Sequence, residues 1–194
     1  MSIFLPKGVI KSSFVCLVPV IALLALLNGT WDGGFVVQFL DLELNFMRVD
    51  KLSIVFGIIF CIAAFLGNVF AFHLRESTQP FIALIYAGAA IGAVFAGDLI
   101  TLFVYWELTA ISSVFLIWAR KTEGAYHSGM RYLIIQVLSG VVLLFGVALF
   151  FFETGSISFV KMELSSLATA LIFIAFGIKC AFPFLHNWLQ DSYP

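Results

Sequence analysis

The chain has 194 residues, of which 62% are hydrophobic and 11% are charged, and its formal net charge is −1. This composition places the chain in a lipid bilayer. The nearly balanced charge, without a basic run long enough to follow a row of phosphates, argues against nucleic acid as a partner.

Six apolar runs each approach the length that a helix needs to cross about 30 Å of hydrocarbon, and they predict six transmembrane helices. The first run follows Lys7 and Lys11, which also suits a signal peptide, but no small-residue cleavage site precedes Asn28, so we expect a retained helix. The predicted fold is therefore an all-α membrane protein with a single transmembrane domain over 1–194. The runs lie at roughly 12–27, 52–74, 81–97, 99–119, 132–152 and 165–189.

Basic residues in the short loops predict the orientation. One side carries twice as many as the other, which predicts a multi-pass protein of the cell inner (plasma) membrane with both termini in the cytoplasm. The richer, cytoplasmic side has Lys7, Lys11, Arg75, Arg120, Lys121 and Arg131, and the outer side has Arg48, Lys51 and Lys161.

The long outer loop between the first two runs alternates apolar and polar residues over 40–46. The preceding Asp32-Gly33-Gly34 offers a turn. This pattern predicts a short amphipathic β-hairpin around 33–47 at the membrane surface.

The cysteines predict no cofactor chemistry. Cys16, Cys61 and Cys180 all lie inside apolar runs and lack the paired spacing of metal ligands. We therefore expect neither a disulfide framework nor a metal site, and no cofactor.

Two ionisable residues, Glu107 and Lys179, lie deep inside apolar runs. A charged side chain at a helix centre costs about 2.5–3.5 kcal/mol on insertion scales, so such residues usually mark ion paths. Their predicted depths differ by roughly 9 Å at about 1.5 Å per residue, and the sequence leaves open whether they pair. The alternatives are a buried ion pair that fixes helix register, a position of either residue in the headgroup region, and a proton or cation path.

Pro183 favours the ion path because its ring clashes with the carbonyl four residues earlier, which is that of Lys179. A helix broken in mid-membrane exposes carbonyls that are tolerated where they line a watery cavity. His186 is a candidate to continue the path, and Gln136 is a candidate to hold water. The remaining polar residues of the spans, for which we expect no individual roles because serine commonly bonds to its own helix, are Tyr86, Ser112, Ser113 and Ser139.

Three segments carry a family resemblance: GDLITLFVYWELTAISSVFLI (97–117), TGSISF (154–159) and FGIKCAFPFLHNWLQDSYP (176–194). Together they resemble the proton-translocating, antiporter-like membrane subunits of respiratory complex I, Mrp-type Na+/H+ antiporters and membrane-bound hydrogenases. The resemblance implies that Glu107 is the essential membrane glutamate, Lys179 the lysine of the first broken helix, and Pro183 the helix-breaking proline.

The chain also departs from the family pattern. Residues 190–193 read Gln-Asp-Ser-Tyr, where relatives commonly have Pro-Asp-Ala-His, and this ending is nearer the antiporter branch, its D-type member in particular. The resemblance implies about fourteen helices in two inverted repeats, so we expect an incomplete first half. By this resemblance we expect the family's N-terminal helix and everything after the first broken helix to be missing from these 194 residues.

Three functions are compatible with these residues. The first is proton translocation, coupled to Na+ or another cation, as a membrane subunit of a multisubunit Na+/H+ antiporter that uses the Glu107–Lys179 pair. The second is a proton-pumping membrane subunit of an NADH-quinone oxidoreductase or membrane-bound hydrogenase, in which this chain has no redox centre of its own. The third is an assembly or scaffold piece that transports nothing.

Overall fold

The computed structural model describes residues 9–29, 34–40, 42–73 and 78–192. Lys7 and Arg75, which contribute to the predicted orientation, and Asp32 and Gly33 of the predicted turn lie outside the described residues.

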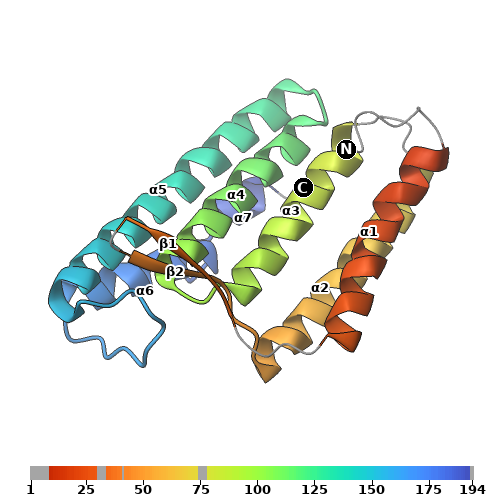
Figure 1. Cartoon of the computed structure of the whole chain (residues 1–194). Helices are drawn as coiled ribbons and strands as arrows, with labels where there is room; N and C mark the ends of the chain where they lie inside the picture. The colour runs from red at the N-terminus through yellow and green to blue at the C-terminus, as the bar shows by residue number, and fades with distance from the viewer. Residues whose placement is uncertain (1–8, 30–33, 41, 74–77, 193–194) are drawn as a thin grey trace.

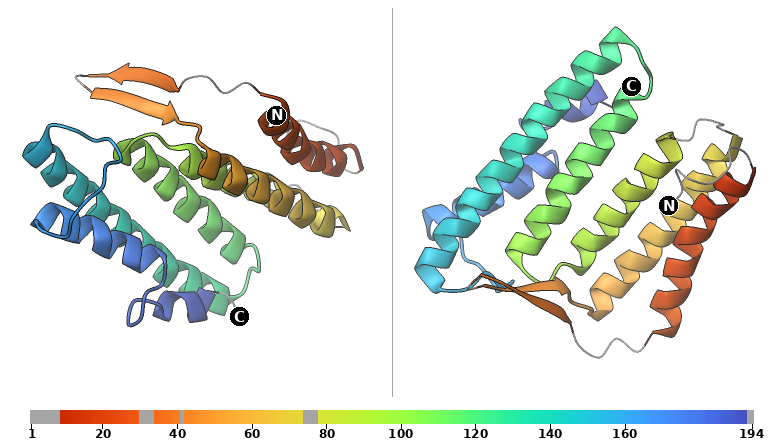
Figure 2. Two further views of the ribbon diagram at one scale, coloured as in Figure 1. Left: turned by 90° about the horizontal axis from the view of Figure 1, so that it is seen from below. Right: turned by 45° about the horizontal axis from the view of Figure 1, so that its top comes forward.

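Five helices stand in a row in the order of the chain, and a sixth packs against the fifth (Figures 1 and 2). A short 3-10 turn, η2 (Ala71–His73), follows the second helix. The row consists of α1 (Val9–Asn28), α2 (Lys51–Phe70), α3 (Thr78–Phe95), α4 (Leu99–Trp118) and α5 (Glu123–Thr154).

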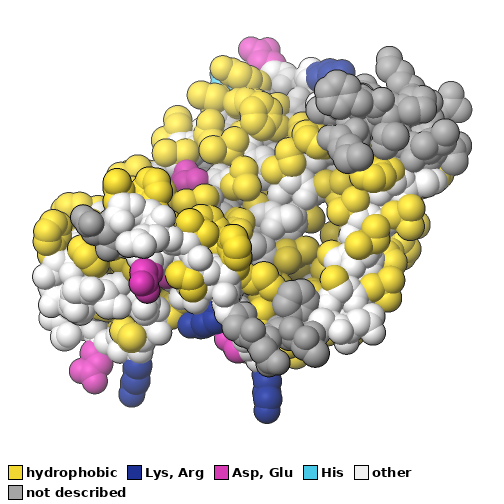
Figure 3. Space-filling view, in the orientation of Figure 1, with side chains coloured by type: hydrophobic (Ala, Val, Ile, Leu, Met, Phe, Trp, Pro, Cys, Tyr) yellow, Lys and Arg dark blue, Asp and Glu magenta, His cyan; other side chains and the backbone are white. Residues whose placement is uncertain are grey.

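Helices α2, α3, α4 and α5 are long and apolar enough to cross a membrane. Two shorter apolar helices complete the set within the described residues, at Ser12–Asn28 and Leu167–Lys179. An apolar helix thus lies in each of the six predicted runs, and four of the six helices are long enough to cross the membrane. Figure 3 shows hydrophobic side chains along the helices, with the Lys and Arg side chains gathered at the top and bottom of the view.

Helix α5 is longer than predicted. It begins at Glu123 rather than near residue 132, and its 32 residues extend over about 48 Å. The Thr122 side chain accepts a hydrogen bond from the backbone N–H of Ala125 at 3.1 Å and so caps the first turn. Hydropathy alone does not predict the first turns of α5, because these turns are polar and include His127.

The last apolar run is broken, as predicted near Lys179 and Pro183. Helix α6 (Leu167–Lys179) has 13 residues and spans about 20 Å, which is too short to cross the bilayer. Helix α7 (Asn187–Ser192) begins eight residues after Lys179 and packs against α5. A non-helical segment therefore lies between two half-helices.

The predicted hairpin is present as β1 (Phe35–Phe39) and β2 (Leu42–Met47), which pair antiparallel. It lies across the end of the helix row where α4 begins (Figure 1). We call this the hairpin end, and the opposite end, where α4 turns into α5, the turn end.

Asp98 attaches the hairpin to the helices. Its buried carboxylate accepts hydrogen bonds from the backbone N–H of Asn45 at 2.7 Å, and from the N–H and hydroxyl of Thr101 at 2.7 and 2.8 Å. It therefore caps α4 and binds β2 with the same side chain. The main hydrophobic core lies beside it, where α4, α5 and α6 meet beneath the hairpin.

Candidate functional site

Glu107 lies on α4 at its contact with α5. Its Oε1 is buried and accepts no hydrogen bond from the described residues. The carboxylate occupies the space over Gly140 of α5, where an added Cβ would collide with Oε1. The glycine thus creates the room in which the carboxylate lies, and no side chain among the described residues forms an ion pair with it.

Lys179, the last residue of α6, reaches the same point of α4. Its ammonium donates a hydrogen bond to the backbone oxygen of Trp106 at 3.3 Å and lies 5.0 Å from the centre of the Trp106 ring. Both contacts favour a cation, as does the negative end of the α6 dipole. The ammonium is therefore held one residue from Glu107.

Glu107 and Lys179 attract each other electrostatically. Within the described part of the chain, however, no ion pair of 4.0 Å or less joins them. The roughly 9 Å difference in predicted depth, at about 1.5 Å per residue, does not keep them apart, because the long lysine side chain reaches α4. The two side chains are therefore neighbours without a direct ion pair between them.

Trp106 holds this site together. Its indole N–H donates to Ser139 of α5 at 3.3 Å, and its ring meets Phe176 of α6 edge-on at 5.0 Å. Three helices thus converge on one side chain, which is only 5% exposed. Sequence reasoning missed this role and that of Ser139. The available signal was a large aromatic residue directly before a membrane carboxylate.

The α6 break has a defined local structure. The backbone N–H of Phe182 donates to Gly177 and that of Ala181 to Ile178, which is the paired pattern of a Schellman motif. Ala181 takes the left-handed conformation, with φ of 53°, that glycine usually supplies. Pro183 follows this motif, so the proline lies just past the helix end and has no N–H with which the helix could continue.

Phe184 also has a positive φ, 71°, so this short segment holds two non-glycine residues in an uncommon conformation. Such strain persists only where surrounding structure enforces it. The Trp188 indole supplies part of that structure, because it donates to the Ile178 carbonyl at 3.1 Å and packs against the Tyr132 ring at 5.5 Å.

The other predicted path residues are placed differently. Gln136 is fully buried on α5, and its amide nitrogen and oxygen have no hydrogen-bond partner among the described residues. It lies one turn before Gly140, on the same face. His186 is partly buried just before α7, and no described hydrogen bond or ion pair links its side chain to Glu107 or Lys179. Gln136 therefore lies one helical turn from the residue that contacts the Glu107 carboxylate, and the role of His186 stays a prediction.

No group of three or more His, Cys, Asp or Glu side chains in the described ranges is arranged to hold a metal ion. The chemistry that this arrangement offers is charge movement between a carboxylate and an ammonium.

The transmembrane model of the NADH:quinone oxidoreductase/Mrp antiporter family matches residues 96–194, which include α4 to α7 and the whole site. The chain belongs to this family.

Two curated relatives illustrate the similarity. The chain is 30% identical over 190 residues to the A-type Na(+)/H(+) antiporter subunit of Alkalihalophilus pseudofirmus, covering 86% of this chain and 23% of that protein. It is 29% identical over 205 residues to the A1-type Na(+)/H(+) antiporter subunit of Staphylococcus aureus, covering 92% of this chain and 25% of that protein. The chain spans about a quarter of the length of these relatives.

Solved structures share the fold of this antiporter-family chain. Respiratory complex I from Thermus thermophilus matches with a TM-score of 0.79 at 23% identity, covering 94% of this chain and 41% of that one. The Mrp complex from Dietzia sp. matches with a TM-score of 0.79 at 24% identity, covering 94% and 38%. An archaeal membrane-bound sulfane sulfur reductase matches with a TM-score of 0.73 at 22% identity, covering 95% and 41%.

Proposed function

We propose that this chain translocates protons across the membrane as one subunit of a larger assembly, with Glu107 and Lys179 as the groups that carry charge. The observation behind the proposal is the position of Lys179 at the end of a broken helix, bonded to the carbonyl that precedes a buried carboxylate. Ionisable groups inside the bilayer are costly, and ion paths are their commonest use.

The geometry suggests how charge on one residue controls the other. While Glu107 is ionised, it attracts the Lys179 ammonium and helps to keep its proton. When Glu107 takes up a proton, that attraction is lost, and the ammonium keeps only the Trp106 carbonyl and ring as partners. Lys179 then releases its proton more readily to the next acceptor on the path.

The names of the relatives support a role in an antiporter. Both curated relatives are A-type by name, which favours the A-type over the D-type that the sequence resemblance indicated. By this proposal the partners are other membrane subunits, the lipid bilayer, H+ and Na+. We further propose that residues 1–194 correspond to part of the first half of an antiporter-like subunit, in the plasma membrane with both termini in the cytoplasm.

The second candidate is a proton-translocating subunit of a redox-driven complex. The equal TM-scores of 0.79 for complex I and for the Mrp complex favour it as much as they favour an antiporter. A proton-transport assay in membrane vesicles distinguishes the two candidate functions. An antiporter moves protons when Na+ is added, and a redox-driven complex does so only when an electron donor is oxidised.

Glu107→Gln and Lys179→Ala test the proposal in vesicles that contain the complete assembly. We expect each variant to reduce proton movement at least tenfold while the protein level and melting temperature stay normal. The matched controls, Glu153→Gln and Lys161→Ala, change exposed residues of the same types and should leave transport unchanged. Normal transport in both site variants would support a scaffold role and overturn the proposal.

A further inference from the structure

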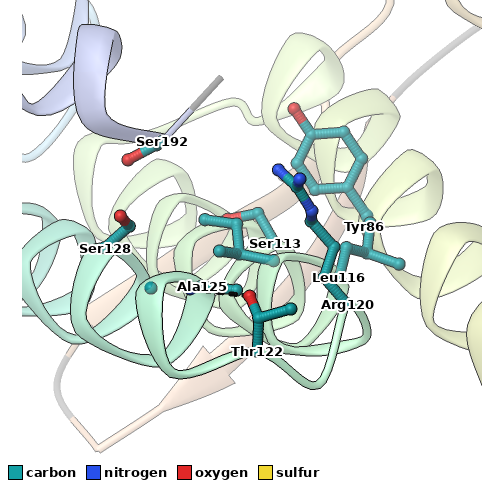
Figure 4. Close-up of a pocket in the computed structure, with 10 residues that line it drawn as sticks. Tyr86, Ser113, Leu116, Arg120, Thr122, Ala125, Ser128 and Ser192 are labelled. Atoms are coloured by element: carbon teal, nitrogen blue, oxygen red, sulfur yellow. Dashed lines mark hydrogen bonds between the residues drawn. The ribbon is translucent and has the colours of Figure 1, made fainter. Parts of the chain in front are cut away.

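A polar cavity of about 630 Å³ opens at the turn end, between α3, α4, α5 and α7. Figure 4 shows the side chains that line it, which come from these elements and from the turn between α4 and α5. Within the described residues the lining has one charged side chain, that of Arg120. The other polar members all carry a hydroxyl group and are Tyr86, Ser113, Thr122, Ser128 and Ser192. Hydrogen-bond donors around a cation suit an anionic group.

An apolar groove of about 500 Å³ adjoins this cavity. It lies between residues 60–71, which end α2 and begin η2, and residues 79–90 of α3, and we call it the α2–α3 groove. Tyr86 and Leu116 line both hollows, so the polar cavity and the groove are neighbours. Tyrosine suits such a boundary, because its ring is apolar and its hydroxyl is polar.

The α2–α3 groove has the depth of one lipid leaflet. Its lining on α3 begins at Gln79, in the first turn of that helix, and ends at Ala90. This distance is about 16 Å along the helix axis, and half of the hydrocarbon core is about 15 Å. The lining opposite runs from Ala71 back to Phe60, over the same number of residues. The groove therefore reaches from the membrane surface at the turn end to the middle of the bilayer.

An acyl chain fits this shape better than a helix does. A helix about 16 Å long and 10 Å wide occupies roughly 1,300 Å³, which is more than twice the volume of the groove. A single acyl chain is much thinner. Since lipid tails are as apolar as the groove walls, its attachment depends on close van der Waals contact and on its headgroup.

The neighbouring cavity determines which headgroup fits. A phosphate beside Tyr86 meets the Arg120 guanidinium, which binds phosphate oxygens through two parallel hydrogen bonds. No Asp or Glu among the described residues lines the cavity, so no carboxylate is present there to pair with the ammonium of a zwitterionic headgroup. The cavity therefore favours a headgroup whose net charge is negative.

We propose that the turn end binds one anionic phospholipid, with its phosphate in the polar cavity on Arg120 and one acyl chain in the α2–α3 groove. Phosphatidylglycerol has the required chemistry, because it lacks an ammonium and its glycerol hydroxyls can bond to the serine and threonine side chains of the cavity. The lipid fills the hollow between α2 and α3 and connects both helices to α4. This inference requires only that the helices lie in a bilayer, and it does not rest on the proposed function.

The test labels the groove with a photoreactive lipid. The complete assembly is reconstituted into phosphatidylcholine bilayers that contain a small fraction of phosphatidylglycerol with a diazirine in the middle of one acyl chain. After illumination, the labelled residues are identified by mass spectrometry of peptides. Phosphatidylcholine with the same photoreactive chain is the headgroup control.

We expect phosphatidylglycerol to label residues 60–71 and 79–90 about tenfold more than phosphatidylcholine does, because one charge-assisted hydrogen bond changes affinity by about this factor. Arg120→Gln should reduce the phosphatidylglycerol label about tenfold, whereas Arg120→Lys, which keeps the charge, should retain most of it. Lys121→Gln is the matched control, because it removes the next charge along the chain, which does not line the cavity.

Ala87→Phe tests the groove separately from the headgroup site. Ala87 lines the groove, so the added ring takes the space of the acyl chain, and the label should fall to the level of phosphatidylcholine. Gly88→Phe is the matched control. It places the same ring one position further on, outside the groove lining, where an added Cβ meets nothing within 4 Å. The label should then stay unchanged.

Several outcomes would overturn the proposal. Equal labelling by the two lipids, or full labelling of Arg120→Gln or Ala87→Phe, would show that the cavity and the groove do not select this lipid. Loss of label in Lys121→Gln or Gly88→Phe as well would show that the losses are not specific to the site. Absence of label from both lipids would mean that a protein segment of the assembly covers the groove.

Discussion

Gly140→Ala tests the close contact between α5 and the Glu107 carboxylate. An alanine Cβ at this position would lie 2.7 Å from Glu107 Cδ, nearer still to Oε1, and 3.4 Å from Phe103. Carbon atoms in contact lie about 3.5–4.0 Å apart, so the carboxylate must move by about 1 Å. The backbone can stay in place, because the displaced atoms are the end of a flexible side chain.

The expected effect is therefore on transport and not on folding. The strained rotamer of the displaced Glu107 side chain costs about 0.5–1.5 kcal/mol. Alanine in place of glycine stabilises the helix by about 1 kcal/mol, which offsets this cost. We expect the free energy of unfolding to change by less than about 1 kcal/mol. Displacement of a reacting group by about 1 Å costs on the order of 100-fold in rate, so proton movement should fall between about 10- and 100-fold.

The assay is the initial rate of Na+-driven proton movement in vesicles, normalised to protein level, together with a melting curve. Gly67→Ala is the matched control, since an added Cβ there meets nothing within 4 Å. The double variant Gly140→Ala with Glu107→Asp should transport no worse than Glu107→Asp alone, because the shorter side chain leaves room for the methyl group. A normal rate for Gly140→Ala, or a collapse of its stability, would refute this reasoning.

Three further predictions concern the framework of the site. Asp98→Ala should destabilise the protein by on the order of 2–4 kcal/mol, because it removes a helix cap and leaves the backbone N–H groups of Asn45 and Thr101 without their acceptor. Limited proteolysis should then cut the hairpin faster, and equal cleavage in wild type and variant would contradict the attachment. Gly92→Ala should destabilise the protein by about 1–3 kcal/mol, because the added methyl group collides with the Tyr105 ring. Gly88→Ala, one turn away, adds a methyl group with nothing within 4 Å and should leave the stability unchanged. Equal melting temperatures for the two variants would contradict the collision. The Ser53 backbone N–H donates a hydrogen bond to the Asp50 carboxylate and holds the pKa of Asp50 below its usual value. The stability that this helix cap gives is therefore fully present above a pH of about 4. It is lost as the pH falls through the lowered pKa of Asp50. The melting temperatures of wild type and Asp50→Ala should converge in acid, and a difference that grows there would exclude this explanation.

The spans, the hairpin and the break followed from local sequence. Apolar runs report membrane helices because no other arrangement satisfies the backbone in lipid. The alternation of apolar and polar residues over 40–46 likewise predicts a strand, because successive side chains of a strand point to opposite faces. The extra turns of α5 before residue 132 escaped prediction because they lie outside the apolar run and depend on the Thr122 cap.

The sequence by itself also marked Glu107, Lys179 and Gln136, since a polar group in hydrocarbon carries a cost that needs a reason. It did not determine which groups meet. Lys179 lies 73 residues from Trp106 along the chain and Ser139 lies 33 from it. The room for the carboxylate comes from Gly140 on the neighbouring helix α5. Helix packing decided these contacts, because side chains distant in sequence become neighbours only when the helices have taken their places.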